Sequence, residues 1–178
     1  MAKGGKIQTF AQQLMNKYVP FFDVEKDKML GNTQLAFAAA YKRRDEKYML
    51  TKKIKIWGVE NQQVVFVSVS PEPVTVERVQ QYIDDLENDF ALYVPSHEEH
   101  MSTIITGILV TDQAVSEKIV KKVRKYRKVK FVKFGLHGWV EIYFALVDLK
   151  QKKLTIHPKG HSFVQVIDKL VKEEREGI

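Results

Sequence analysis

The stretch from Thr103 to Thr111, with the sequence TIITGILVT, decides the fold of this chain. Side chains alternate between the two faces of a β-strand, and here both sets of positions are largely apolar. Strands of this kind lie in the centre of a sheet and are covered on both faces. We therefore expect a sheet with packed layers on either side of this segment.

Hydrophobic spacing on either side of this strand predicts an α+β domain with the order α-β-β-β-α-β-α-β-β-(β)-α. The sheet is expected to be mixed and mainly antiparallel, with about five to six strands flanked by about four helices. Strands are predicted at residues 34–42, 47–57, 64–69, 103–111, 130–134, 139–148 and, at one edge, 154–157. Helices are predicted at residues 6–19, 75–93 and 116–128, and from Ser162 onward, where Gln165 takes the capping-box position.

Length and composition limit the kinds of fold and of chemical site that this chain can form. The 178 residues fit one domain over residues 1–178, large enough to fold without a disulfide or a metal. The absence of cysteine excludes disulfides, thiolate zinc sites, iron–sulfur clusters and cysteine nucleophiles. We expect a cytoplasmic protein, because no apolar segment follows the basic N-terminus and none is long enough to cross a membrane.

Three short strings carry a resemblance to a known family. They are PSHEEHM at residues 95–101, FGLHGW at residues 134–139 and LVDL at residues 146–149. Together they resemble a family of uncharacterised bacterial conserved hypothetical proteins, over most of the chain from Phe22 onward. This resemblance implies no function.

The element order α-β-β-β-α-β is also similar to the core of restriction-endonuclease-like folds. That resemblance implies an acidic residue on the second core strand and an acid-x-Lys motif on the third, which converge on a divalent metal. The third predicted strand, residues 64–69, has no acid, and the second has only Asp45 and Glu46 in its leading turn. The order of elements therefore agrees with that family, whereas the nuclease site is missing.

Positive charge is concentrated in one segment. The chain has 29 Lys/Arg and 22 Asp/Glu, and nine of the basic residues lie between Lys118 and Lys133, where there is no acid. Most of them fall on one face of the helix predicted at residues 116–128, opposite an apolar stripe. The candidate residues for binding nucleic acid or another anion are Lys118, Lys121, Lys122, Arg124, Lys125 and Lys128. A solvated surface helix is the alternative interpretation of the same pattern.

Two further groups of residues could carry chemistry. His97 and His100, with nearby carboxylates, offer donors that suit zinc and related metals, although their spacing differs from the metalloprotease motif. Exposed loop histidines are the alternative interpretation. Glu141 shares a strand face with Trp139 and Tyr143, so in a cleft it could have a raised pKa and act as an acid or a base. A half-buried sheet edge is the alternative there.

These observations leave three hypotheses for function. The first is a binding module that is not an enzyme, whose basic helix engages an anionic partner, with nucleic acid as the first candidate. The second is a metal-dependent hydrolase that uses His97 and His100. The third is a module that assembles into homo-oligomers by pairing basic and acidic helices. None of the motifs in the sequence requires a cofactor, and the identity of any cofactor stays open.

Overall fold

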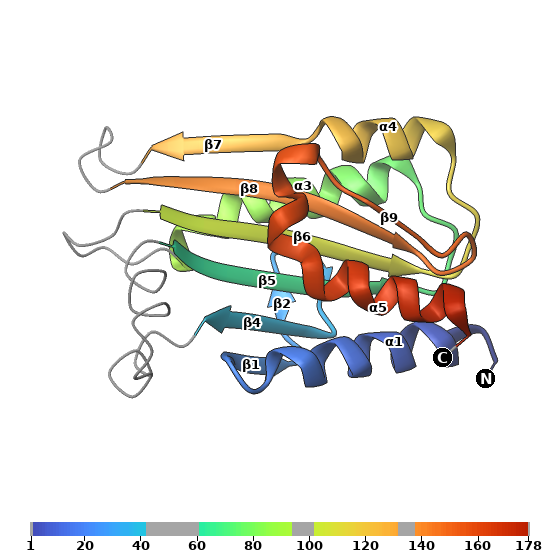
Figure 1. Cartoon of the computed structure of the whole chain (residues 1–178). Helices are drawn as coiled ribbons and strands as arrows, with labels where there is room; N and C mark the ends of the chain where they lie inside the picture. Colours follow the sequence, from blue (N-terminus) through green and yellow to red (C-terminus); the bar gives the residue numbers. More distant parts are fainter. Residues whose placement is uncertain (1, 42–60, 94–101, 132–137, 178) are drawn as a thin grey trace.

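The computed structural model describes residues 2–41, 61–93, 102–131 and 138–177, which form a mixed sheet between two layers of helices (Figure 1). The strand order is β1-β4-β5-β6-β8-β7, and β9 pairs with β8 beyond the end of β7. The strands of this seven-stranded sheet are β1 (Phe22–Lys26), β4 (Phe37–Tyr41), β5 (Asn61–Ser70), β6 (Ser102–Thr111), β7 (Arg127–Phe131), β8 (Trp139–Asp148) and β9 (Lys153–Thr155). A separate hairpin contains β2 (Met29–Leu30) and β3 (Thr33–Gln34).

The described residues contain four α-helices, two on each face of the sheet. They are α1 (Ala2–Tyr18), α3 (Val76–Asp89), α4 (Glu117–Lys125) and α5 (Gln165–Glu176). Two 3-10 helices, η2 (Phe90–Tyr93) and η4 (Pro158–Val164), follow α3 and precede α5. The predicted α+β class, with a mixed sheet and four helices, is confirmed. None of the helices in the described ranges combines the length and the apolar character that crossing a bilayer requires.

Strand β6 is the centre of the molecule. It pairs in parallel with β5 on one side and with β8 on the other, over its whole length. Ile104 and Ile108 enter the core under α1 and α5, whereas Ile105 and Leu109 enter the core under α3 and α4. Every residue of β6 is buried, and each large apolar side chain stabilises the fold by about 1.5–3 kcal/mol. The expectation of a strand covered on both faces is confirmed.

The parallel pairing determines where the helices lie. Parallel neighbours cannot be joined by a tight turn, so the chain must cross one face of the sheet between them. Helix α3 makes this crossing from β5 to β6, and α4 begins the crossing from β6 toward β8. Both helices pack on the same core. Helices α1 and α5 contact each other and cover the opposite face (Figure 1).

The N-terminal half differs from prediction in one connection. No strand was predicted between the helix at residues 6–19 and the strand at residues 34–42, but β1 and β2 lie there. Strand β1 has alternating half-buried and exposed positions and pairs with the alanine-rich β4, whose own assignment as a strand is confirmed. The strand predicted at residues 47–57 lies outside the described residues.

The end of the basic helix and the start of the last helix also differ from prediction. The basic helix was expected to continue to Lys128, but α4 ends at Lys125, and β7 begins at Arg127 and pairs with β8. Tyr126 has an extended backbone between them. The last helix was expected to start at Ser162 with a capping box, but η4 occupies residues 158–164 and α5 begins at Gln165 without a side-chain cap.

Substitution of Gly160 should test how closely η4 packs on the sheet. A Cβ atom at this position would lie 2.6 Å from Cδ1 of the Tyr143 ring. A buried ring can move little, so we expect Gly160→Ala to lower the free energy of unfolding by about 1–3 kcal/mol. Thermal unfolding of this variant should be compared with that of Gly5→Ala, because a Cβ at Gly5 meets nothing within 4 Å. If the two variants were equally stable, the close packing of Gly160 against the Tyr143 ring would be contradicted.

Candidate functional site

Helix α4 presents most of the predicted cations on one exposed surface. Its buried residues, Ile119 and Val123, pack against the sheet, and Ser116 caps its first turn by accepting a hydrogen bond from the Ile119 amide. The opposite face of the helix projects away from the core. The exposed cations there are Lys118, Lys121, Arg124 and Lys125.

Lys128 joins this surface although it lies on a strand. It is opposite Ile142 in the β7–β8 ladder, and Ile142 belongs to the core under α3 and α4. Because opposite residues in a ladder share a face, Lys128 lies on the same face of the sheet as α4. Its side chain is exposed. The helix boundary was predicted wrongly for this residue, but the strand keeps it beside the helix.

Lys122 differs from the other predicted residues. It is half-buried and donates a hydrogen bond from Nζ to Oε1 of Gln80 on α3. The neighbouring Tyr126 hydroxyl donates to Oε1 of Glu87, also on α3, over 2.9 Å. These two bonds tie α4 to the more acidic α3 within a single chain. Lys122 therefore holds the basic helix in place, and we do not include it among the exposed cations.

The structure adds a second basic segment that the sequence pattern did not reveal. Residues 149–161 contain four lysines, at positions 150, 152, 153 and 159, and no acid. Strand β9 lies against α4, and a groove of about 520 Å³ separates them. Arg124 of α4, Lys153 of β9 and His161 of η4 line this groove. In the sequence, the absence of acids was the only signal for this basic segment. The pairing of β9 with the end of β8, which brings the segment beside α4, could not be predicted.

We call the exposed cations on α4, β7 and β9 the basic edge, and it contains Lys118, Lys121, Arg124, Lys125, Lys128 and Lys153. Of these, Arg124 and Lys153 line the groove. Within the described residues, none of these six side chains takes part in an ion pair. Their positive charges therefore add to one field on this side of the molecule. A surface of this kind attracts polyanions and releases their counterions on binding.

On the opposite face of the sheet, Glu141 is the centre of a hydrogen-bond network. Arg127 donates to its Oε2 atom from Nη2 over 3.0 Å and from Nε over 3.2 Å, and Trp139 donates to Oε1 over 3.2 Å. The Tyr143 hydroxyl also donates to Oε2. All four side chains come from the facing positions of β7 and β8.

This network overturns the hypothesis that Glu141 has a raised pKa. Burial by itself raises the pKa of the carboxyl, but the bonds from Tyr143, Trp139 and Arg127 outweigh burial, so the pKa lies below its ordinary value. Burial, together with the bond to Glu141, raises the pKa of Tyr143. A carboxylate held ionised by three donors is a structural anchor for the β7–β8 edge, and it is a poor proton donor or acceptor near neutral pH.

The metal hypothesis receives no support from the described residues. His97 and His100 lie outside them. His157 accepts a hydrogen bond from the Lys159 amide, and Nε2 of His161 lies 3.7 Å from Asp168. In the part of the chain that the structure describes, no group of three or more histidines and carboxylates could hold a metal ion.

Comparison with known proteins gives one match. Residues 6–169 match a domain of unknown function, DUF8052. The chain belongs to the DUF8052 family. No curated protein and no solved structure matches it. Membership in DUF8052 agrees with the expected likeness to uncharacterised proteins. Three points stay predictions: the bacterial origin, the family likeness carried by the three strings, and the likeness to restriction-endonuclease-like folds.

The Glu141 network of this DUF8052 protein should make its stability depend on pH in a defined direction. A carboxyl whose folded pKa is lowered contributes stability above its unfolded pKa, and that stability is lost as pH falls through the folded value. We expect Glu141→Gln to lower the free energy of unfolding by about 1 kcal/mol at pH 7. The difference from the wild type should shrink below pH 4.5, the ordinary value for this group. Urea unfolding of both proteins from about pH 3 to 7 measures this difference in the free energy of unfolding.

A difference that grows on acidification would contradict the lowered pKa. Glu25→Gln is the matched control. Glu25 also forms an ion pair, with Lys28, but its side chain is 65% exposed. Removal of so exposed a pair should change stability little at any pH.

Proposed function

We propose that this protein binds an anionic polymer at the basic edge and that nucleic acid is the natural partner. The observation that carries the proposal is the set of six exposed cations on α4, β7 and β9 that have no carboxylate partner within the described residues. An isolated surface cation is easily solvated. Six on one side of the molecule produce a field that interacts favourably with closely spaced negative charges.

The shape of the basic edge also favours a polymer. Helix α4 and strand β7 follow one another along the same side of the sheet (Figure 1). With nine residues at about 1.5 Å and five at about 3.3 Å, the two elements span roughly 30 Å. That length matches several consecutive phosphates of a nucleic acid strand. All six cations are exposed and four of them lie outside the groove, so most of the expected contacts are with phosphates, which carry no sequence information.

Two other functions compete with this proposal. A metal-dependent hydrolase would depend on His97 and His100, which lie outside the described residues. A self-assembling module would pair the basic edge with an acidic surface of another copy. Within one chain α3 and α4 already lie side by side. Their contact uses hydrogen bonds from Lys122 to Gln80 and from Tyr126, which follows α4, to Glu87, and neither bond involves an exposed cation of the basic edge.

A salt titration and a charge-reversal variant should distinguish nucleic-acid binding from the two competing functions. We expect the affinity for a labelled single-stranded oligonucleotide, measured by fluorescence anisotropy, to fall roughly 100-fold between about 50 and 300 mM salt, as about four neutralised phosphates require. The variant Lys121→Glu/Lys125→Glu/Lys128→Glu should lose binding and keep its melting temperature within about 3 °C, because all three side chains are exposed.

The matched control reverses three exposed lysines on α1 and α5, at the opposite face, in the variant Lys6→Glu/Lys17→Glu/Lys169→Glu. It has the same net charge as the test variant and should retain most of the affinity. Equal loss in both variants would show that only net charge matters. Absence of binding at about 50 mM salt would refute the proposal. Oligomers that dissociate at high salt would favour self-assembly.

A further inference from the structure

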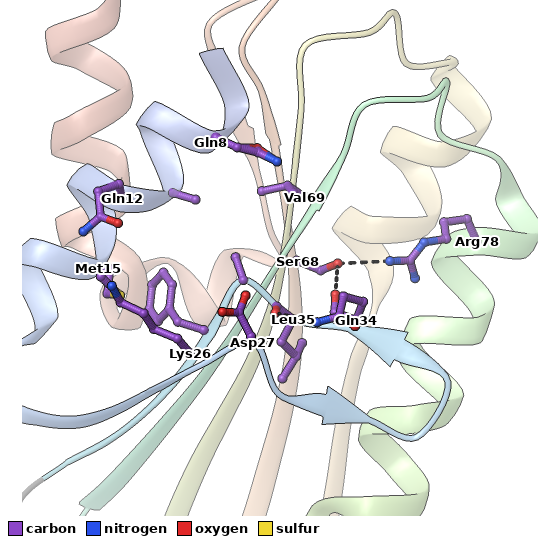
Figure 2. Close-up of a pocket in the computed structure, with 13 residues that line it drawn as sticks. Gln8, Gln12, Met15, Lys26, Asp27, Gln34, Leu35, Ser68, Val69 and Arg78 are labelled. Carbon is purple, nitrogen blue, oxygen red and sulfur yellow. Dashed lines mark hydrogen bonds between the residues drawn. The ribbon is translucent and has the colours of Figure 1, made fainter. Parts of the chain in front are cut away.

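A pocket of about 460 Å³ lies on the other side of the molecule from the basic edge, between α1 and the strands β1, β4 and β5 (Figure 2). Its volume is in the range of sites for small molecules. Ser68 and Val69 line it at the carboxyl end of β5, a strand that is parallel to its neighbour β6. Open sheets with parallel strands bind ligands at this end. The pocket is therefore well placed for a ligand, and its side chains determine which one.

Arg78 is held rigidly at the wall of the pocket. Its Nη2 donates to Oγ of Ser68 over 3.0 Å, and its Nη1 donates to Oγ1 of Thr33 over 3.4 Å. Both hydroxyls are fixed in turn: Ser68 donates to the carbonyl of Gln34, and Thr33 donates to the buried carboxylate of Asp85. Figure 2 shows the guanidinium directed toward Ser68. A bound anion would not have to immobilise this side chain, which lowers the entropic cost of binding.

Although the buried carboxylate of Asp85 lies one hydroxyl away, behind Thr33, Arg78 is not paired directly with a carboxylate. Its hydrogen-bond partners are two neutral hydroxyls, and within the described residues it forms no ion pair with a carboxylate. The guanidinium also lies over the ring of Tyr82, 5.7 Å from its centroid. A guanidinium has five N–H donors, and two of those of Arg78 make the bonds to Ser68 and Thr33. Carboxylates are the anions that a planar guanidinium binds best through paired hydrogen bonds.

The remaining lining residues define the rest of the ligand. Met15, Leu35 and Phe37 line the inner wall and are almost fully buried, whereas the amides of Gln8, Gln12 and Gln34 are exposed and provide hydrogen-bond donors and acceptors. Lys26 and Asp27 follow at the end of β1, where Asp27 has a left-handed backbone (φ 51°) that turns the chain at the pocket. Arg78 and Lys26 against Asp27 leave the lining with one net positive charge.

We propose that this pocket binds a small organic monocarboxylate with a flat apolar body. The carboxylate lies on Arg78, within reach of the field of Lys26, and the body packs beside Met15 on Ala36 and Val69, the half-buried apolar residues of the lining. The guanidinium of Arg78 can pair with one carboxylate, whereas the second charge of a dianion would be repelled by Asp27 in the lining and by Asp85 behind Thr33. This function is independent of the basic edge, since the two sites share no residue.

Three probes of one shape and different charge test the proposal: benzoate, benzamide and benzylamine. The chain has five methionines, so the methyl region of a ¹³C spectrum contains few signals. Met15 lines the pocket, and the exposed Met29 lies outside it and serves as an internal control. We expect benzoate to shift the Met15 signal with a Kd of about 1–10 mM. Benzamide should bind at least about fivefold more weakly, and benzylamine should bind more weakly still.

Substitution of Arg78 and of Lys26 should show which positive charge binds the carboxylate. Arg78→Gln should weaken benzoate binding at least about tenfold, which corresponds to the loss of a charge-assisted hydrogen bond. Because Arg78 also braces Ser68 and Thr33, this variant could unfold. Lys26→Gln is the second variant, since Lys26 is exposed and forms no ion pair in the described residues; it should weaken binding about threefold without loss of stability. Lys6→Gln, outside the pocket, should leave binding unchanged.

The proposal is overturned if benzoate does not shift the Met15 signal, if benzamide binds as tightly as benzoate, or if benzylamine binds best. It is also overturned if neither Lys26→Gln nor a folded Arg78→Gln weakens benzoate binding. The variant with Lys121, Lys125 and Lys128 reversed should bind benzoate as the wild type does. Failure at the pocket is therefore distinguishable from failure at the basic edge.

Discussion

The parallel pairing of β6 with both β5 and β8 is the constraint on which the rest of this structure depends. A strand that is buried on both faces needs a layer of helices on each side, and parallel neighbours need connections that cross a face. These two requirements account for α3 and α4 on one face and for α1 and α5 on the other. They also determine both sites that we propose. The basic edge lies where the crossing from β6 returns to the sheet through β7, and the pocket lies where β5 ends.

The basic side chains of this fold have different structural roles. Arg127 lies among the basic residues of the sequence, yet it is paired with Glu141 and anchors the β7–β8 edge. Lys122 is used to join α4 to α3. The cations that remain exposed are those that face neither the core nor another helix. A count of positive residues in the sequence therefore overstates the number of exposed cations on α4 and misses Lys153, which β9 adds from elsewhere in the chain.

Much of the fold was predictable, since the central strands carry local signals. Strand β8 was predicted with its observed bounds, and β6 differed by one residue, because apolar side chains on both faces indicate a buried strand wherever it lies. Lys and Arg tolerate both a helix and a strand, so residues 125–128 had no local signal for the end of α4. Their structure is decided by pairing with β8, a contact between segments that are distant in the sequence. The pocket was unpredictable for the same reason, since Gln8 of α1 and Arg78 of α3 meet only in the folded chain.

The central claim is that the basic edge is the surface that contacts a polyanion, and its location can be measured directly. At 20.7 kDa the protein is small enough for amide ¹H–¹⁵N spectra. A single-stranded oligonucleotide of about 12 residues would be titrated into labelled protein at about 50 mM salt. We predict that the largest shifts fall on α4, the start of β7 and β9, and that α1 and α5 change little. Shifts concentrated on α1 and α5, or spread evenly over the surface, would contradict this account.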